Sequence, residues 1–263
     1  MSLAFDRTGS GPVLVLLHPL GADRHVWAPV TERLAAEREV IAFDLPGFGE
    51  SAPLNGGGPP TPAALAEAVA ASLPPGGPHH VAGNSLGGWV ALELAAAGHA
   101  QSVTAIAPAG LWPEPLAPKR GVARGLARAA RPLLPALVRS PAGRRVALAG
   151  TVRNPARVPP EDALRLVRAY ADAPGFEAVN QAMRAGRFTR LEHIRVPVTL
   201  GWPEYDHLVR RPAHLPPNVR SVPLPGAGHV PMWGAPEAVA QLLLRGSRPP
   251  LGSKLPGLAP GPR

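Results

Sequence analysis

Short apolar runs alternate with helical patterns along most of the chain. Runs of strand length occupy residues 13–18, 40–44, 80–84, 103–107, 196–202 and 219–225. The first four runs are continuously apolar, which is typical of strands buried on both faces of a parallel sheet, and the last two resume the same rhythm later in the chain. Helical patterns occupy residues 27–37, 61–73, 87–97 and 236–244. This order predicts an α/β fold with a mostly parallel central sheet flanked by helices.

The strand rhythm stops near Leu111 and returns only after Arg190. The interval contains helical patterns separated by Pro and Gly, which predicts a helical cap inserted at 111–190 into a core domain made of 1–110 and 191–246. The last segment, 247–263, has too little apolar material to pack and is expected to be a disordered tail.

Length and composition agree with one such domain and narrow its chemistry. The 263 residues are 45% hydrophobic, enough for a full core. Cysteine is absent, which excludes disulfides, thiolate metal sites and cysteine nucleophiles. No signal-peptide pattern and no apolar stretch of membrane-spanning length is found, so we expect a cytoplasmic protein.

The net charge of +9 belongs to one region of the chain. Residues 115–160 contain ten Lys or Arg and no Asp or Glu, so the remainder sums to −1. Arg120, Arg124 and Arg128 repeat every four positions and are expected on one helical face. A solvated face is the simpler interpretation; the alternative is weak contact with an anionic lipid surface, a carrier protein or a phosphate-bearing substrate tail. No recognition motif accompanies the charge, so nucleic acid is not an expected partner.

Ser85 lies in the segment Gly83-Asn84-Ser85-Leu86-Gly87, which matches G-x-S-x-G. The motif follows a predicted strand and precedes a predicted helix, the context in which a sharp turn presents a nucleophilic serine. The alternative is an ordinary tight turn with a capping serine.

A serine nucleophile needs a base and an acid that orients the base. Of the nine histidines, His229 is the candidate base, because it lies in a glycine-containing loop directly after the last predicted strand. Asp206, in the loop after the strand that ends near Trp202, is the candidate acid, and Glu204 is its competitor.

In this chain order, Ser85, Asp206 and His229 resemble the catalytic triad of the α/β-hydrolase family. The segment LLHPLGADRHVW resembles the family's oxyanion loop, and DLPGFGES resembles its next glycine turn. The resemblance implies that the backbone N–H groups of Leu20 and Leu86 form the oxyanion hole. Where the family usually has His-Gly, this chain has His18-Pro19, and proline cannot donate. His18 is expected to support the loop through a hydrogen bond.

The resemblance also implies that the cap covers the active site. Its candidate substrate-binding residues, which could equally pack in the interior of the cap, are Trp112, Tyr170, Phe176, Met183 and Phe188.

The function expected is that of a serine hydrolase of the carboxylesterase type, acting on a small acyl or ester substrate through an acyl-enzyme, with no metal or organic cofactor. A carbon–carbon bond hydrolase, a thioesterase or an acyltransferase of the same fold would use the same residues. A non-catalytic hydrolase-fold protein that binds a ligand is the alternative from another class.

Overall fold

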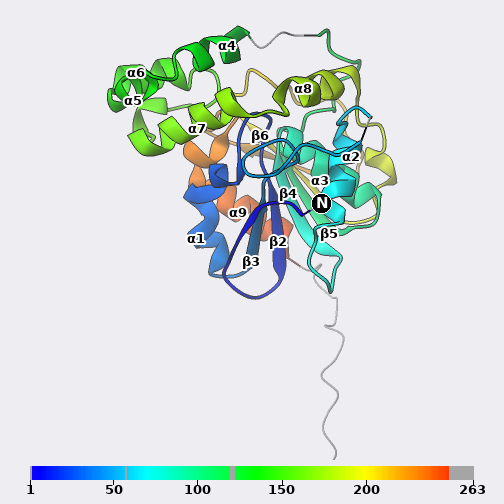
Figure 1. Cartoon of the computed structure of the whole chain (residues 1–263). Helices are drawn as coiled ribbons and strands as arrows, with labels where there is room; N and C mark the ends of the chain where they lie inside the picture. The colour runs from blue at the N-terminus through cyan, green and yellow to red at the C-terminus, as the bar shows by residue number, and fades with distance from the viewer. Residues whose placement is uncertain (1, 57, 119–121, 249–263) are drawn as a thin grey trace, which may run out of the picture.

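The computed structural model describes residues 2–56, 58–118 and 122–248, which contain one seven-stranded sheet (Figure 1). Its strand order is β1-β3-β2-β4-β5-β6-β7, and all neighbours except β1 and β3 are parallel. The strands are β1 (Phe5–Thr8), β2 (Val13–Leu17), β3 (Glu39–Phe43), β4 (His79–Asn84), β5 (Ala100–Ile106), β6 (Val198–Pro203) and β7 (Val219–Leu224). The predicted α/β fold is confirmed, and β4 lies at the centre of the sheet.

Strand β1 is not predicted by the sequence pattern. All four of its residues are exposed, so it has no apolar run, and it pairs antiparallel with β3 at the edge of the sheet. The polar side chains of such a strand are compatible with an edge position, where one side of the strand remains unpaired.

Helices cover both faces of the sheet because successive side chains of each buried strand point to opposite sides. In β2, Val15 and Leu17 belong to one core cluster, whereas Leu14 and Leu16 belong to the other. The first cluster packs under α2 (Pro62–Ala70) and α3 (Leu86–Ala96), and the second under α1 (Ala28–Ala35) and α9 (Pro236–Gly246). Figure 1 shows these two pairs on opposite sides of the sheet.

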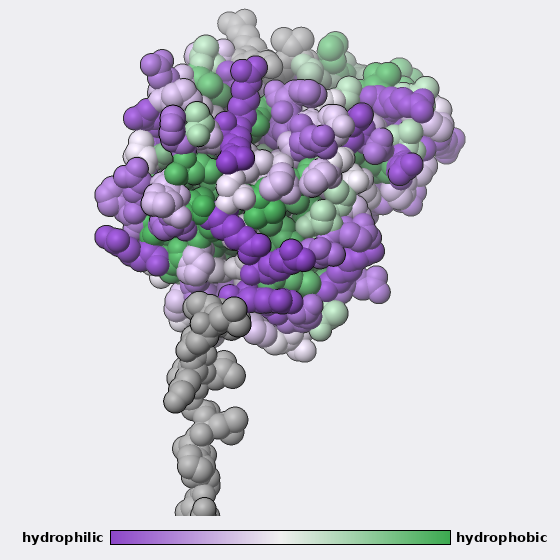
Figure 2. All heavy atoms as spheres, turned by 180° about the vertical axis from the view of Figure 1, so that it is seen from behind, coloured by the Kyte–Doolittle hydropathy of each residue, from purple (hydrophilic) through white to green (hydrophobic). Residues whose placement is uncertain are grey.

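Five α-helices in the described residues between β5 and β6 lie across one end of the sheet (Figure 1). They are α4 (Val122–Ala129), α5 (Leu134–Arg139), α6 (Pro141–Ala147), α7 (Pro160–Asp172) and α8 (Phe176–Ala185). The described 3-10 helices are Arg24–Trp27, Pro155–Arg157, Leu191–His193 and Pro231–Trp233. We call the region containing α4 to α8 the cap. Hydrophilic side chains dominate the part of its surface seen in Figure 2, with a few hydrophobic ones between them.

The interpretation of the arginines as a solvated helical face is wrong for Arg124. Its side chain is buried, donates from Nε to the Tyr170 carbonyl over 3.1 Å and from a terminal nitrogen to the Ala173 carbonyl, and lies over the Phe176 ring. Arg124 therefore joins α4 to the carboxyl end of α7, while Arg128 is exposed and Arg120 lies outside the described residues.

The packed core extends one residue further than predicted at the carboxyl end. Ser247 is buried, and its Oγ accepts a hydrogen bond from Arg38 Nε over 3.1 Å, so it belongs to the end of α9 rather than to a tail. The rest of the predicted tail, from residue 249, lies outside the described residues. Among the helices described here, none is long and apolar enough to cross a bilayer.

Candidate active site

Ser85 occupies a sharp turn between the end of β4 and the start of α3. Its backbone has φ 54° and ψ −114°, a conformation that costs a non-glycine residue about 1–3 kcal/mol. A Cβ atom at Gly83 would lie 2.1 Å from the Gly87 carbonyl oxygen, and one at Gly87 would lie 2.1 Å from the Leu17 carbonyl oxygen. The two glycines of the motif are thus required because backbone passes where their side chains would be.

Asp206 and His229 form a hydrogen-bonded pair at the same end of the sheet. Asp206 Oδ2 lies 2.8 Å from His229 Nδ1, and both side chains are almost completely buried. The other carboxylate oxygen accepts the N–H groups of Leu208 over 2.7 Å and Val209 over 3.1 Å. Burial raises the pKa of Asp206, but the hydrogen bonds and the charge of His229 outweigh this effect and lower it below its ordinary value. The carboxylate is therefore ionised at neutral pH and directs the imidazole.

The loops that carry these two residues are held together by their neighbours. Glu204 Oε2 accepts the N–H of Gly226 over 2.8 Å, and the Tyr205 N–H donates to the Ala227 carbonyl over 2.9 Å. Of the two carboxylates considered from the sequence, Asp206 contacts the imidazole, and Glu204 closes the loop after β7.

Asn84 connects the serine turn to the histidine loop. It is fully buried, and its Nδ2 donates to the carbonyl oxygens of Ile106 and His229, both over 3.1 Å. The residue before Ser85 thus touches the backbone of His229. Within the described part of the chain, Ser85 Oγ and His229 Nε2 each have no hydrogen-bond partner, which leaves both free for a substrate or for each other.

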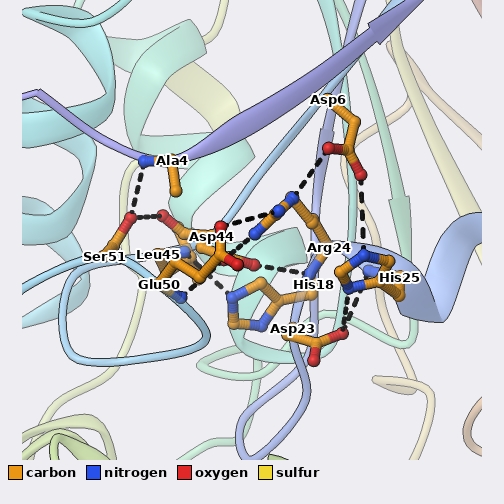
Figure 3. Close-up of polar contacts among 10 residues, drawn as sticks. All are labelled: Ala4, Asp6, His18, Asp23, Arg24, His25, Asp44, Leu45, Glu50 and Ser51. Carbon is orange, nitrogen blue, oxygen red and sulfur yellow. Dashed lines mark hydrogen bonds and ion pairs between the residues drawn. The ribbon is translucent and has the colours of Figure 1, made fainter. Parts of the chain in front are cut away.

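His18 supports the loop after β2, as expected. Its Nε2 accepts the N–H of Leu45 over 2.9 Å (Figure 3), so the proton resides on Nδ1. Nδ1 donates to the Pro19 carbonyl over 2.8 Å. Burial lowers the pKa of His18, which favours this neutral form.

An ion-pair network centred on the buried Asp44 and Arg24 holds the same loop against the loop after β3 (Figure 3). Asp44 is fully buried; it accepts the Arg24 N–H over 2.7 Å, the Glu50 N–H over 2.8 Å and a guanidinium nitrogen of Arg24. Arg24 also pairs with Asp6 over 3.0 Å and Glu50 over 2.8 Å. Burial alone would lower the pKa of Arg24, but the surrounding carboxylates raise it above its ordinary value.

The two N–H groups expected to form the oxyanion hole belong to segments that touch. Leu86 begins α3, so its N–H has no partner within the helix. In the described residues, neither it nor the Leu20 N–H donates to a protein acceptor. The close approach of Gly87 to Leu17 and His18 joins the start of α3 to the loop that contains Leu20.

The side chains expected to bind substrate occupy different positions in the structure. A Cβ atom at Gly21, next to Leu20, would lie 2.7 Å from the Tyr170 ring and 3.0 Å from the Phe176 ring, so these two rings rest on the loop. Trp112 packs edge-on against Trp89 of α3, with ring centroids 5.8 Å apart. Met183 and Phe188 are buried in the core cluster.

Sequence reasoning did not assign a role to Asn84, Arg24 or Asp44. Asn84 lies within the motif itself, but its two acceptors come from distant segments that no local pattern connects to it. Arg24 lies in LLHPLGADRHVW and Asp44 lies in DLPGFGES, the two segments that resemble the family. A charged residue beside an apolar run was the signal in each segment that could have indicated an ion pair. In the described residues, no group of three or more His, Asp or Glu side chains has a metal-binding arrangement.

The model of the alpha/beta hydrolase family matches residues 14–242. The chain belongs to this family. A structural relative of this α/β hydrolase is a thermophilic esterase from Thermogutta terrifontis, with 26% identity, a TM-score of 0.70 and 92% of each chain covered.

Two curated relatives of this α/β hydrolase bear different names. The pimeloyl-[acyl-carrier protein] methyl ester esterase of Aeromonas salmonicida is 45% identical over 95 residues, which is 36% of either chain. The chain therefore matches only about a third of that protein's length. Epoxide hydrolase EphH of Mycobacterium tuberculosis is 35% identical over 178 residues, covering 62% of this chain and 83% of the relative.

Proposed function

We propose that the protein is a serine ester hydrolase in which Ser85 attacks the ester carbonyl. His229 Nε2 takes the serine proton and then delivers it to the leaving alcohol, and Asp206 holds the imidazole in the required tautomer. The observation that carries the proposal is the 2.8 Å pair of Asp206 and His229, joined through Asn84 to the turn that presents Ser85.

The next step is hydrolysis of the acyl-enzyme. His229 removes a proton from water, the resulting hydroxide attacks the acyl carbonyl, and the proton returns to Ser85 as the acid is released. In both tetrahedral intermediates, the N–H groups of Leu20 and Leu86 would stabilise the oxyanion. Tyr170 and Phe176, which rest on the loop containing Leu20, would contact the acyl group.

The identity of the nucleophile favours an ester over an epoxide as substrate. A serine hydroxyl that opens an epoxide leaves an alkyl ether, which an activated water does not cleave, so the enzyme would be consumed after one turnover. Attack on an ester gives an acyl-enzyme that water hydrolyses. The names of the two esterase relatives agree with this chemistry.

The test is covalent labelling followed by turnover. Wild type should gain one fluorophosphonate adduct and hydrolyse short-chain p-nitrophenyl esters, whereas Ser85→Ala should do neither. Ser72→Ala is the matched control, because this serine lies at the end of α2, where its hydroxyl only donates to the Ala68 carbonyl. Equal labelling of wild type and Ser85→Ala would refute the proposal and favour a protein that only binds ligands.

A further inference from the structure

A cavity of about 540 Å³ lies between the cap and the loops that carry Asp206 and His229. One wall is the chain that joins α6 to α7, residues 149–157, together with Arg145; the other wall is formed by Tyr205, His207 and Gly228. The volume is in the range of small-molecule sites. None of the residues proposed above to react with or contact an ester belongs to its lining.

The charged side chains that line the cavity are all basic. They are Arg145, Arg153 and Arg157, and the imidazole of His207 also lines the cavity. In the described part of the chain, none of the three guanidinium groups forms an ion pair or donates a hydrogen bond to a protein acceptor. The exposed arginines thus face a cavity whose lining offers no carboxylate.

The walls of the cavity are held in place by contacts behind the lining. Arg144 is buried and donates from its terminal nitrogens to the carbonyls of Val138, Arg139 and Ala156 over 2.8–2.9 Å, which adds a further positive charge that has no carboxylate partner among the described residues. The Arg153 guanidinium lies 4.2 Å from the centroid of the Tyr205 ring, an arrangement that orients it.

We propose that this cavity binds a phosphate group carried by an organic ligand. Guanidinium groups match phosphate oxygens with paired hydrogen bonds, and a dianion would offset the mutual repulsion of unpaired cations. The Val230 N–H donates to the Thr151 carbonyl over 2.9 Å, which links the wall formed by residues 149–157 to the residue after His229. The source of the phosphate is either a soluble metabolite or a lipid headgroup.

The experiment is a binding titration that does not depend on hydrolysis. Full-length protein is titrated with inorganic phosphate, glycerol 3-phosphate and phosphatidylglycerol vesicles, with chloride matching the ionic strength, and both heat of binding and melting temperature are recorded. The test variant is Arg153→Gln/Arg157→Gln. The control is Arg128→Gln/Arg168→Gln, which removes two exposed cap arginines without ion pairs in the described structure. If the test variant has a lower melting temperature than wild type in the chloride buffer, Arg145→Gln replaces it as the test variant.

We expect saturable binding and a rise in melting temperature for wild type and control, with the affinity of the test variant reduced about tenfold or more. Binding of both soluble phosphates would identify a soluble ligand, and saturable binding of vesicles alone would identify a lipid headgroup. Equal affinity in the test and control variants, or no saturable binding of any probe, would overturn the proposal. Because the readouts do not involve Ser85, failure of the ester hydrolysis would leave this result unaffected.

Discussion

Replacement of Asp206 by Asn tests the acid–base arrangement most directly. Asp206 Oδ1 accepts two backbone N–H groups, and Oδ2 contacts His229 Nδ1. The asparagine oxygen can keep the two backbone bonds, which leaves its NH2 group pointing at Nδ1. The imidazole must then accept at Nδ1 and carry its proton on Nε2, the atom that has to remove the serine proton.

The expected loss follows from this reversed tautomer. The same exchange in a serine protease triad lowers kcat about 10⁴-fold, which corresponds to about 5 kcal/mol of transition-state stabilisation. We expect a similar loss for Asp206→Asn with little change in KM and in melting temperature, measured with a p-nitrophenyl ester.

Glu204→Gln is the matched control. Glu204 also accepts a backbone N–H, from Gly226 over 2.8 Å, and it lies two residues from Asp206, but it does not contact the imidazole. The amide can keep that bond, so kcat should change less than about threefold. If Asp206→Asn retained more than about a tenth of wild-type kcat, or if Glu204→Gln lost as much activity, the assignment of the acid would be wrong.

Three further changes test the scaffold. Gly87→Ala places a Cβ atom 2.1 Å from a carbonyl oxygen of β2 and should lower the free energy of unfolding by about 3 kcal/mol or more in urea titrations. Gly125→Ala in α4, where the space is open, should raise the free energy of unfolding by up to about 1 kcal/mol. Equal effects of the two changes would contradict the packing argument. Arg24→Met leaves the buried Asp44 without its cation and should cost about 3–5 kcal/mol in the same assay; a loss below about 1 kcal/mol would show that the network is dispensable. Burial lowers the pKa of His80 from 6.5 to about 4, so the unfolded state binds more protons between these values and stability falls as the pH is lowered from about 6.5 to about 4. His80→Gln should remove about 2 kcal/mol of this pH dependence. If the melting temperature of the variant changed with pH between 4 and 7 as steeply as that of wild type, His80 would not be its source.

The parts of the fold that could be predicted are those with a local signal. Continuous apolar runs predicted β2, β3, β4 and β5, because a strand buried on both faces must be apolar throughout. The return of strand-length segments after Arg190 predicted β6 and β7, although β7 lies at the edge of the sheet and is only partly buried. Strand β1 could not be predicted in this way because its four residues are exposed and form no apolar run. The chain order of Ser85, Asp206 and His229 located the candidate site because parallel strands bring their carboxyl ends to one edge of the sheet.

The parts that could not be predicted depend on contacts between distant segments. Helical spacing placed Arg124 on a face with its neighbours, but it could not tell which residues of the face another helix would cover. Likewise, the link from Asn84 to His229 spans 145 residues, and no periodic pattern records such a pairing. Predicting these contacts requires knowledge of how the cap and the loops are placed on the sheet.

Backbone hydrogen bonds connect the cap to core loops on two sides. The Gly175 N–H donates to the Gly47 carbonyl over 2.9 Å on one side, and the Val230 N–H donates to the Thr151 carbonyl over 2.9 Å on the other. A rigid movement of the whole cap away from the sheet would break both bonds, so we expect the cap to keep its position. Hydrolysis of a dissolved ester should therefore rise hyperbolically with concentration, without the abrupt gain at the solubility limit that marks lipases activated at an oil–water interface.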